Sequence, residues 1–131
     1  MEQDEMLVKL RPTINTIENN AQTSDIELFQ NQVLRPILKL QHDRLMMLFD
    51  MFLSEQKNNF NQLKLDEKEK YITNLLQKQV AFRNQVVGCT IGLFTFNEFS
   101  QYASNKVTIN RRILNLAKQR ILSAYKNNTV H

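Results

Sequence analysis

The sequence is poor in the residues that form tight turns and interrupt helices. Among its 131 residues there are two glycines and two prolines. Sheets joined by tight turns need glycine at positive φ and proline at turn corners, so this scarcity argues against a sheet-rich fold. It favours a few long helices joined by a few loops, and the length fits a single domain.

Cysteine and histidine are equally scarce, which excludes several kinds of site. Cys89 is the sole cysteine, so the chain has neither an internal disulfide nor a multi-thiolate metal site. The histidines are His42 and the C-terminal His131, and no two histidines have helical ligand spacing. We therefore expect no metal and no cofactor. Because nucleophile and phosphate-loop motifs are also missing, we predict that the chain is not an enzyme.

Long apolar runs are absent as well. Runs such as residues 45–49 end at an acid, and none approaches the roughly 20 residues that a membrane helix requires. The N-terminal sequence is acidic where a secretory signal is basic. We expect a cytoplasmic protein with no membrane segment, and a single cysteine agrees with a reducing compartment.

What the chain does contain is apolar periodicity typical of amphipathic helices. We divide it into an N-terminal arm, residues 1–23, and a single helical-bundle domain, residues 24–131. In the arm, apolar residues at helical spacing are interrupted by Pro12 and followed by a polar run at 19–23. The arm is therefore expected to form a short helix or to be disordered.

The first long helix is predicted from Ser24 or Asp25 to about residue 57. Pro36 lies inside it, where a proline lacks a backbone donor and clashes with the carbonyl four residues earlier. Either two helices meet at Pro36 or one helix kinks there. We predict the kink, because the apolar stripe keeps its phase across the proline.

Local capping signals predict where the next helices begin. Asp66 followed by Glu69 is close to a capping box and begins a second long helix that ends near Gly88 or Gly92. The run 95–98, Thr-Phe-Asn-Glu, is a capping box between the staple residues Phe94 and Phe99, and it begins a short helix. A last helix spans about residues 107–125. The predicted fold is all-α, an irregular bundle of about four helices.

Two sets of polar residues are candidate binding residues. Arg35 and Lys39 share a face of the first long helix with Gln32, and Arg83 and Asn84 lie on the second. Cations on a helix usually face water, with their stems over apolar neighbours. The functional alternative is a polar groove that binds an anion, or a partner's carboxylate, through Arg35 or Arg83.

Charge is distributed unevenly along the chain. Residues 1–98 carry 11 Lys and Arg against 13 Asp and Glu, whereas residues 99–131 carry six Lys and Arg and no acid. A basic final helix can bind nucleic acid or an acidic partner. The candidate residues are Arg111, Arg112, Lys118 and Lys126. Because the cations lie on several faces and few aromatic residues accompany them, nucleic-acid or anion binding is the alternative function.

Three stretches of the chain resemble an uncharacterised family of small all-helical bacterial proteins. They are residues 29–41, residues 82–84 with Gly88 and 91–95, and residues 110–112, and the resemblance covers most of residues 26–122. It implies a helical domain with no established activity. Some members carry a glyoxalase label, but glyoxalases bind a metal through strand-borne His and Glu residues or a His-rich motif. This chain has neither, so no catalytic residue is carried over.

Our leading prediction is a protein-interaction or structural module that binds an unidentified protein partner or forms a homodimer. Its basis is a surplus of large apolar side chains around more than one face of the first helix: Met46, Met47, Phe49, Met51, Phe52 and Leu53. An enzyme remains a third hypothesis. It would need one enclosed pocket formed by Arg35, Lys39, His42, Arg83 and Cys89.

Overall fold

The computed structural model describes residues 2–13, 24–56 and 59–128. All regular structure in these ranges is helical, as predicted, and they contain no strand. The elements are α1 (Glu2–Lys9), α2 (Asp25–Phe29), the π-helix η1 (Gln30–Leu34), α3 (Arg35–Leu40), α4 (His42–Glu55), the 3-10 helix η2 (Phe60–Gln62), α5 (Leu65–Lys78), α6 (Val80–Ile91), α7 (Phe96–Ser104) and α8 (Lys106–Asn128). The prediction of about four helices is too low, because short breaks divide both of the expected long helices.

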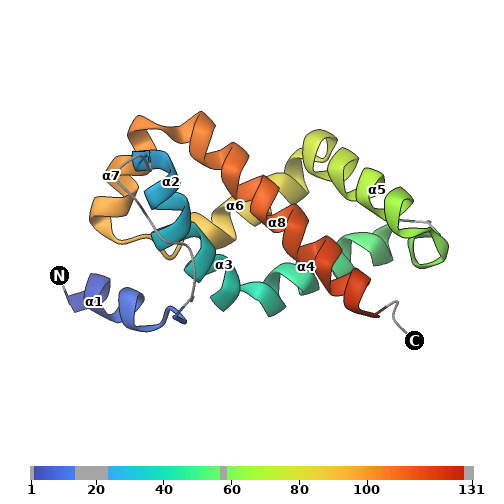
Figure 1. The fold of residues 1–131 in the computed structure, drawn as a ribbon, viewed down its shortest axis with the longest axis horizontal. Helices are drawn as coiled ribbons and strands as arrows, with labels where there is room; N and C mark the ends of the chain where they lie inside the picture. Colours follow the sequence, from blue (N-terminus) through green and yellow to red (C-terminus); the bar gives the residue numbers. More distant parts are fainter. Residues whose placement is uncertain (1, 14–23, 57–58, 129–131) are drawn as a thin grey trace.

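The first predicted long helix is irregular before Pro36 and breaks after it. Residues 30–34 form the π-helical turn η1, and the backbone N–H of Arg35 donates to the carbonyl of Gln30. A proline at the next position supplies no donor, which accounts for an irregular turn there. The α-helical backbone is lost at Gln41, with φ −90° and ψ 9°. Figure 1 shows the ribbon changing direction between α3 and α4, so two helices form in place of one kinked helix.

The second predicted long helix is also two helices. Gln79 has an extended backbone, with φ −93° and ψ 91°, and separates α5 from α6. The capping interaction of α5 lies two positions earlier than predicted, because the Glu67 carboxylate accepts from the Lys64 backbone N–H at 3.1 Å. α6 ends at Ile91 as expected, but Gly92 keeps a right-handed φ of −61°.

The predicted start of α7 is confirmed. Thr95 Oγ1 accepts from the Glu98 backbone N–H at 3.3 Å, and the Glu98 carboxylate accepts from the Thr95 N–H at 2.8 Å. The flanking rings of Phe94 and Phe99 meet edge to face with centroids 5.6 Å apart. The capping box and the staple together satisfy helix N-terminal donors and determine the direction in which the chain enters α7.

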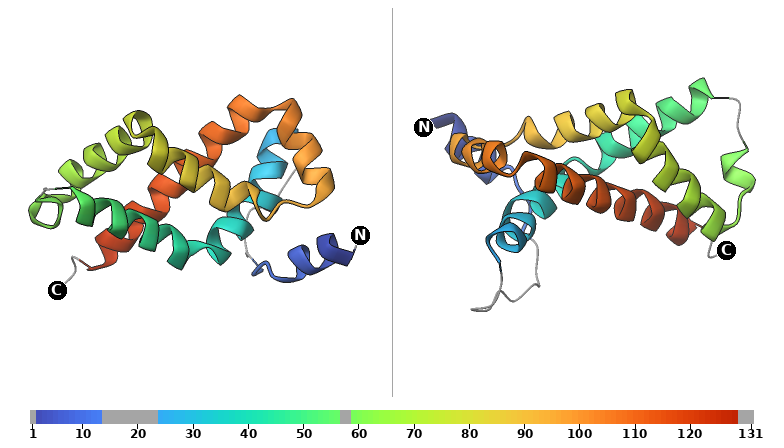
Figure 2. Two further views of the ribbon diagram at one scale, coloured as in Figure 1. Left: turned by 180° about the vertical axis from the view of Figure 1, so that it is seen from behind. Right: turned by 90° about the horizontal axis from the view of Figure 1, so that it is seen from above.

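α8 is the central helix of the core. Its predicted inner stripe is buried: Ile109, Ile113, Leu116, Ala117 and Ile121. In Figures 1 and 2 it crosses the molecule from the α7 end to the α5 end. An aromatic cluster lies at each end of this helix. One contains Phe29, Phe94, Phe99 and Tyr102, and the other contains Phe49, Phe60, Phe82 and Tyr125.

Candidate functional site

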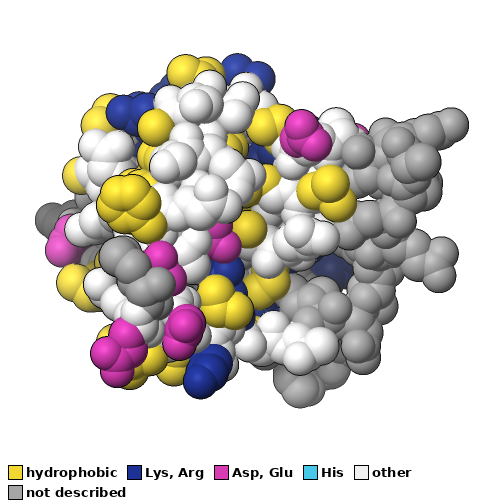
Figure 3. Space-filling model, turned by 90° about the vertical axis from the view of Figure 1, so that its left-hand side faces the viewer, with side chains coloured by type: hydrophobic (Ala, Val, Ile, Leu, Met, Phe, Trp, Pro, Cys, Tyr) yellow, Lys and Arg dark blue, Asp and Glu magenta, His cyan; other side chains and the backbone are white. Residues whose placement is uncertain are grey.

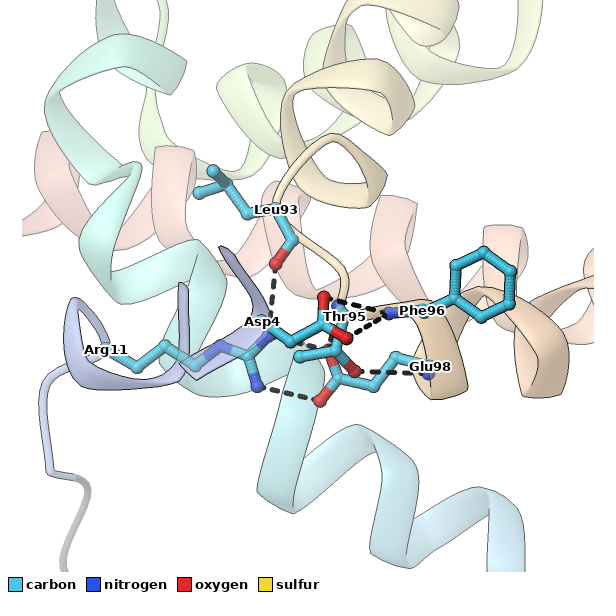
Figure 4. Close-up of polar contacts among 6 residues, drawn as sticks. All are labelled: Asp4, Arg11, Leu93, Thr95, Phe96 and Glu98. Atoms are coloured by element: carbon cyan, nitrogen blue, oxygen red, sulfur yellow. Dashed lines mark hydrogen bonds and ion pairs between the residues drawn. The ribbon is translucent and has the colours of Figure 1, made fainter. Parts of the chain in front are cut away.

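Polar contacts from Asp4 and Arg11 hold α1 against the start of α7 (Figure 4). Arg11 donates to both carboxylate oxygens of Glu98, at 2.8 and 2.6 Å, and to the carbonyl of Leu93 at 3.1 Å. The Asp4 carboxylate accepts from the backbone N–H of Phe96 at 3.2 Å. α1 itself buries no residue. Its position against α7 therefore depends largely on Arg11 and Asp4, which we call the α1 latch.

Glu98 belongs both to the α1 latch and to the capping box of α7. Burial raises the pKa of its carboxyl, but hydrogen bonds from Arg11 and Thr95 and the charge of Arg11 outweigh burial and lower it. The side chains of Arg11 and Glu98 are 7% and 11% exposed, so the ion pair is largely shielded from water. Its bonds are all to groups of this chain, which indicates a structural role, although the buried Arg11 Nε has no hydrogen-bond partner among the described residues.

At the end of the molecule around α1, α2 and α7, the exposed apolar side chains of the described residues do not form one continuous patch. Phe96 is 70% exposed and Met6 is 61% exposed. Figure 3 shows hydrophobic side chains on this end in separate groups among polar and charged ones. A hollow of about 700 Å³ here is lined by polar residues such as Gln32 and Asn97 as well as by apolar ones such as Val8. Isolated exposed apolar residues are ordinary on protein surfaces, so this end is a weak candidate.

A different surface is the groove between α4 and α6. Its volume is about 440 Å³ and its exposed inner surface is apolar. The described residues that line it are Arg44, Met47, Leu48, Met51, Gln85, Gly88 and Cys89. Met47 and Met51, one turn apart on α4, are 63% and 55% exposed. We call this surface the methionine groove.

Gly88 lies in the interior of α6 on the edge of the methionine groove. A Cβ added there meets nothing within 4 Å. A Cβ added to Gly92, by contrast, would lie 3.0 Å from the Gly88 carbonyl oxygen. A side chain at position 92 would therefore be crowded within this chain, whereas a side chain at position 88 would not. Glycine at position 88 is thus not required by internal packing, and glycine inside a helix costs about 1 kcal/mol relative to alanine.

The residues of the enzyme hypothesis do not converge on one another. Cys89 lines the methionine groove, and burial raises the pKa of its thiol, partly offset by the charge of Arg44. His42 Nδ1 contacts Arg120 Nη1 at 3.2 Å on the side of α4 that faces α8. No hydrogen bond joins His42 to Cys89 in the described structure, so the base-and-thiol pair that this hypothesis requires is not seen.

Arg35 and Arg83, the centres of the predicted polar groove, make separate contacts. Arg35 Nε donates to Asn31 Oδ1 at 3.2 Å, within the first helical segment. Arg83 Nη1 donates to the carbonyl of Gln77 at 3.1 Å, at the junction of α5 and α6. Asn84 and Lys39 are exposed, and Lys39 Nζ lies 3.5 Å from the carbonyl of Thr13. No contact links the two predicted sets of residues in the parts of the chain described.

The predicted basic residues of α8 divide into two kinds. Arg111 is exposed, and so is Lys126 near the end of the helix. Arg112 Nη1 donates to Gln30 Oε1 at 3.1 Å, and Lys118 lies 3.5 Å from Glu69. Arg112 and Lys118 are thus engaged in contacts between helices. The α8 cations do not form one continuous basic stripe.

Sequence reasoning did not select several residues that the structure makes prominent. Arg120 was counted only as a charge, yet it lies beside His42 and is close enough to Arg35 for the two charges to interact. Arg11 was not selected because its partner is far away in the sequence. The exposed pair at Met47 and Met51 lies within the predicted surplus of large side chains. The sequence alone does not distinguish them from buried neighbours such as Phe49.

The described residues contain no group of three or more His, Cys, Asp or Glu side chains arranged to hold a metal ion. None of the helices formed by these residues has the length and apolarity needed to cross a membrane.

Comparison of the chain with family models, with curated proteins and with solved structures finds no match.

Proposed function

We propose that this chain is a protein-interaction module that forms a two-fold homodimer through the methionine groove. The observation that carries the proposal is the pairing of two exposed methionines with a mid-helix glycine that this chain does not need for its own packing. Binding rather than catalysis is the role that these side chains can perform.

The methionines supply an apolar driving force for association. Complete burial of a methionine side chain contributes about 1.5–3 kcal/mol relative to leaving it exposed. Met47 and Met51 remain more than half exposed in the single chain, so most of that free energy is available to a partner. Methionine is also unbranched and adapts to irregular surfaces, which makes it common at binding surfaces.

Gly88 explains how a partner helix can approach closely. Without a Cβ at this position, the backbone of α6 is open to the groove. Glycine inside a helix is destabilising by about 1 kcal/mol relative to alanine. No packing within this chain requires Gly88, so we infer that contact with a partner offsets that cost. The groove is bounded by two helices and has no free strand edge, so the fitting occupant is a helix face and not an extended peptide.

A second copy of the chain is the occupant that matches this surface. In a two-fold interface the same patch is used on both sides, so residue i contacts j while j contacts i. The methionine groove presents projecting side chains, Met47 and Met51, beside a recess at Gly88. Two copies related by a two-fold axis place the methionines of each over the glycine of the other.

Sedimentation equilibrium over a range of protein concentrations tests this proposal. The wild-type chain is expected to show a monomer–dimer equilibrium. The double variant Met47→Gln/Met51→Gln keeps side-chain length and helix propensity, removes apolar surface, and is expected to weaken the dimer at least about ten-fold. Met6→Gln is the matched control, because Met6 is similarly exposed on α1, away from the groove.

Gly88→Ala separates the binding role of the glycine from its effect on folding. This variant is expected to stabilise the monomer by about 1 kcal/mol through helix propensity and to weaken the dimer. Asn74→Ala, at an exposed position of α5, raises helix propensity without touching the groove and is expected to leave the dimer unchanged. A wild-type chain that stays monomeric at millimolar concentration, or a dimer that Gly88→Ala strengthens, overturns the proposal.

A further inference from the structure

The methionine groove lies between two helices that run in opposite directions. Gln41, the N-cap residue of α4, donates to the carbonyl of Cys89 near the end of α6. Further along α4, the ring of Phe49 packs against the ring of Phe82 near the start of α6, with centroids 6.2 Å apart. Residue numbers therefore rise along α4 as they fall along α6, so the two helices are antiparallel.

Three sulfur-containing side chains line this groove. Met47 and Met51 lie one turn apart on the same face of α4, and Cys89 lies on α6. Long side chains of a helix lean toward its N-terminus, so both methionines lean toward the Gln41 end of α4. Cys89 lies at this end, because Gln41 donates to its carbonyl. The lean of the side chains thus directs the thioethers of α4 along the groove toward the thiol of α6.

The surroundings of these sulfur atoms suit a soft metal ion. The exposed inner surface of the groove is apolar, and the described residues that line it include no acid and no histidine. Ca²⁺ and Mg²⁺ need oxygen ligands, and zinc sites combine several thiolate or imidazole ligands. Thioether and thiolate sulfur atoms, by contrast, select Cu(I). Arg44 also lines the groove, and its charge repels a divalent ion more strongly than a monovalent one.

We propose that Met47, Met51 and Cys89 form a binding site for one Cu(I) ion. The two thioethers bind as neutral ligands. The ion displaces the proton of the Cys89 thiol, which passes to solvent, and bonds to Sγ, so the copper stays Cu(I) and no electron is transferred. One Cu(I) and one thiolate together carry no net charge, which suits an apolar groove. The methionines are 63% and 55% exposed and have flexible side chains, so they can adjust around an incoming ion.

A site of this kind differs from the metal sites that the sequence argues against. The expectation of no metal took account of histidine spacing and of the single thiol, but not of thioether ligands. A site with one cysteine and two methionines also needs no group of three His, Cys, Asp or Glu side chains. It is complete within one chain, so it does not rest on the proposed homodimer, although both use the methionine groove.

Competition for Cu(I) with the chromogenic chelator bicinchoninate, without oxygen and with ascorbate as the reductant, tests the site in the full chain. The wild-type chain is expected to take one Cu(I) per chain from the chelator. Loss of an outer-shell partner costs about 10–100-fold in metal affinity, so Cys89→Ser and Met47→Leu/Met51→Leu are each expected to weaken binding at least about ten-fold. Met6→Leu is the matched control, because it removes a similarly exposed thioether on α1.

Leucine at positions 47 and 51 separates metal binding from dimer formation. It keeps the apolar surface and the side-chain volume but removes sulfur, so Met47→Leu/Met51→Leu is expected to lose Cu(I) and keep the dimer. Gly88→Ala leaves all three sulfur atoms in place and is expected to keep Cu(I) while weakening the dimer. Chelator competition and sedimentation of the same two variants therefore distinguish failure of one proposal from failure of the other.

Ag(I) probes the same ligands without a change of oxidation state. Its addition is expected to shift the NMR methyl resonances of Met47 and Met51 and to leave that of Met6 in place, with assignments from the leucine variants. If Cys89→Ser fails to fold, the leucine variants decide the outcome, since their substitutions lie at exposed positions. A wild-type chain that takes no Cu(I) from bicinchoninate, full affinity in Met47→Leu/Met51→Leu, or displacement of Cu(I) by Zn²⁺ overturns the proposal.

Discussion

Substituting Arg11 by alanine removes the ion pair through which α1 is held against α7. The wild-type side chain donates twice to the Glu98 carboxylate and once to the Leu93 carbonyl, in surroundings that leave it 7% exposed. Glu98 keeps its bond to the Thr95 N–H in the variant, so the capping box of α7 is expected to survive. The variant thus isolates the contribution of the α1 latch.

The expected magnitude follows from what can move after the substitution. Removing one member of a buried ion pair costs about 3–5 kcal/mol when the remaining charge stays buried. α1 buries no residue, so it can leave and allow water to reach Glu98. The loss then approaches that of hydrogen bonds to a charged group, about 1.5–3 kcal/mol. We expect the free energy of unfolding to fall by about 2 kcal/mol.

A double-mutant cycle measured by urea unfolding tests this reasoning. Glu98→Gln serves as the second variant, because glutamine can also accept from the helix N-cap in a capping box. We expect a coupling free energy of at least about 1 kcal/mol between positions 11 and 98. Hydrogen exchange is expected to speed up for amides of α1 and for Phe96, whose N–H is bonded to Asp4. Additive effects within about 0.5 kcal/mol refute the reasoning.

Three further predictions concern pH and core packing. The pKa of Glu98 is lower in the folded chain than its ordinary value of 4.5. The stability that the Glu98 carboxylate contributes to the fold is therefore complete above pH 4.5 and is lost as pH falls through the folded-state pKa. Acid-unfolding curves of Glu98→Gln are expected to lack this loss. Burial and then the nearby Asp50 raise the pKa of Tyr125 from 10.0 to about 12. The free energy of unfolding is therefore expected to fall as the pH rises from about 10 to about 12. Ultraviolet titration of Tyr125→Phe is expected to lack the ionisation of this phenol. Phe49→Ala is expected to cost about 3–5 kcal/mol in urea unfolding, because Phe49 is fully buried, whereas the 70% exposed Phe96→Ala should cost under about 0.5 kcal/mol.

Local signals in the sequence are sufficient to predict much of the fold. Ser24 caps α2 by accepting from the Glu27 N–H, and Thr95 with Glu98 caps α7. The inner stripe of α8 is buried from Ile109 to Ile121. These predictions succeed because capping and helical periodicity involve residues three or four positions apart, so a short segment of sequence is enough to recognise them.

The breaks at Gln41 and Gln79 are not predictable in the same way. Neither residue is glycine or proline, and the apolar stripes continue past both. Gln41 Nε2 donates to the carbonyl of Cys89 at 3.0 Å, a contact with a distant helix that forms only when α6 packs there. At Gln41 a packing contact accompanies a break that helix propensity does not predict, so the sequence leads to too few helices.

The candidate binding surfaces show the same division. Periodicity predicts that α4 has more large apolar residues than one face can bury, but not that Phe49 is buried while Met47 is exposed. The predicted pairing of Arg35 with Arg83 is not seen, whereas Arg120, which the sequence does not single out, contacts His42. A helix stripe specifies which residues face inward but not which distant helix they face.

By itself the sequence determined that the chain is helical, where α2 and α7 begin, and which side of α8 is buried. These features depend on backbone and side-chain interactions within one or two helical turns. The tertiary structure alone decided that Arg11 pairs with Glu98, that Arg120 contacts His42, and that Gly88 opens onto exposed methionines. Such contacts join residues far apart in the chain, and their geometry depends on how whole helices pack, which no local pattern specifies.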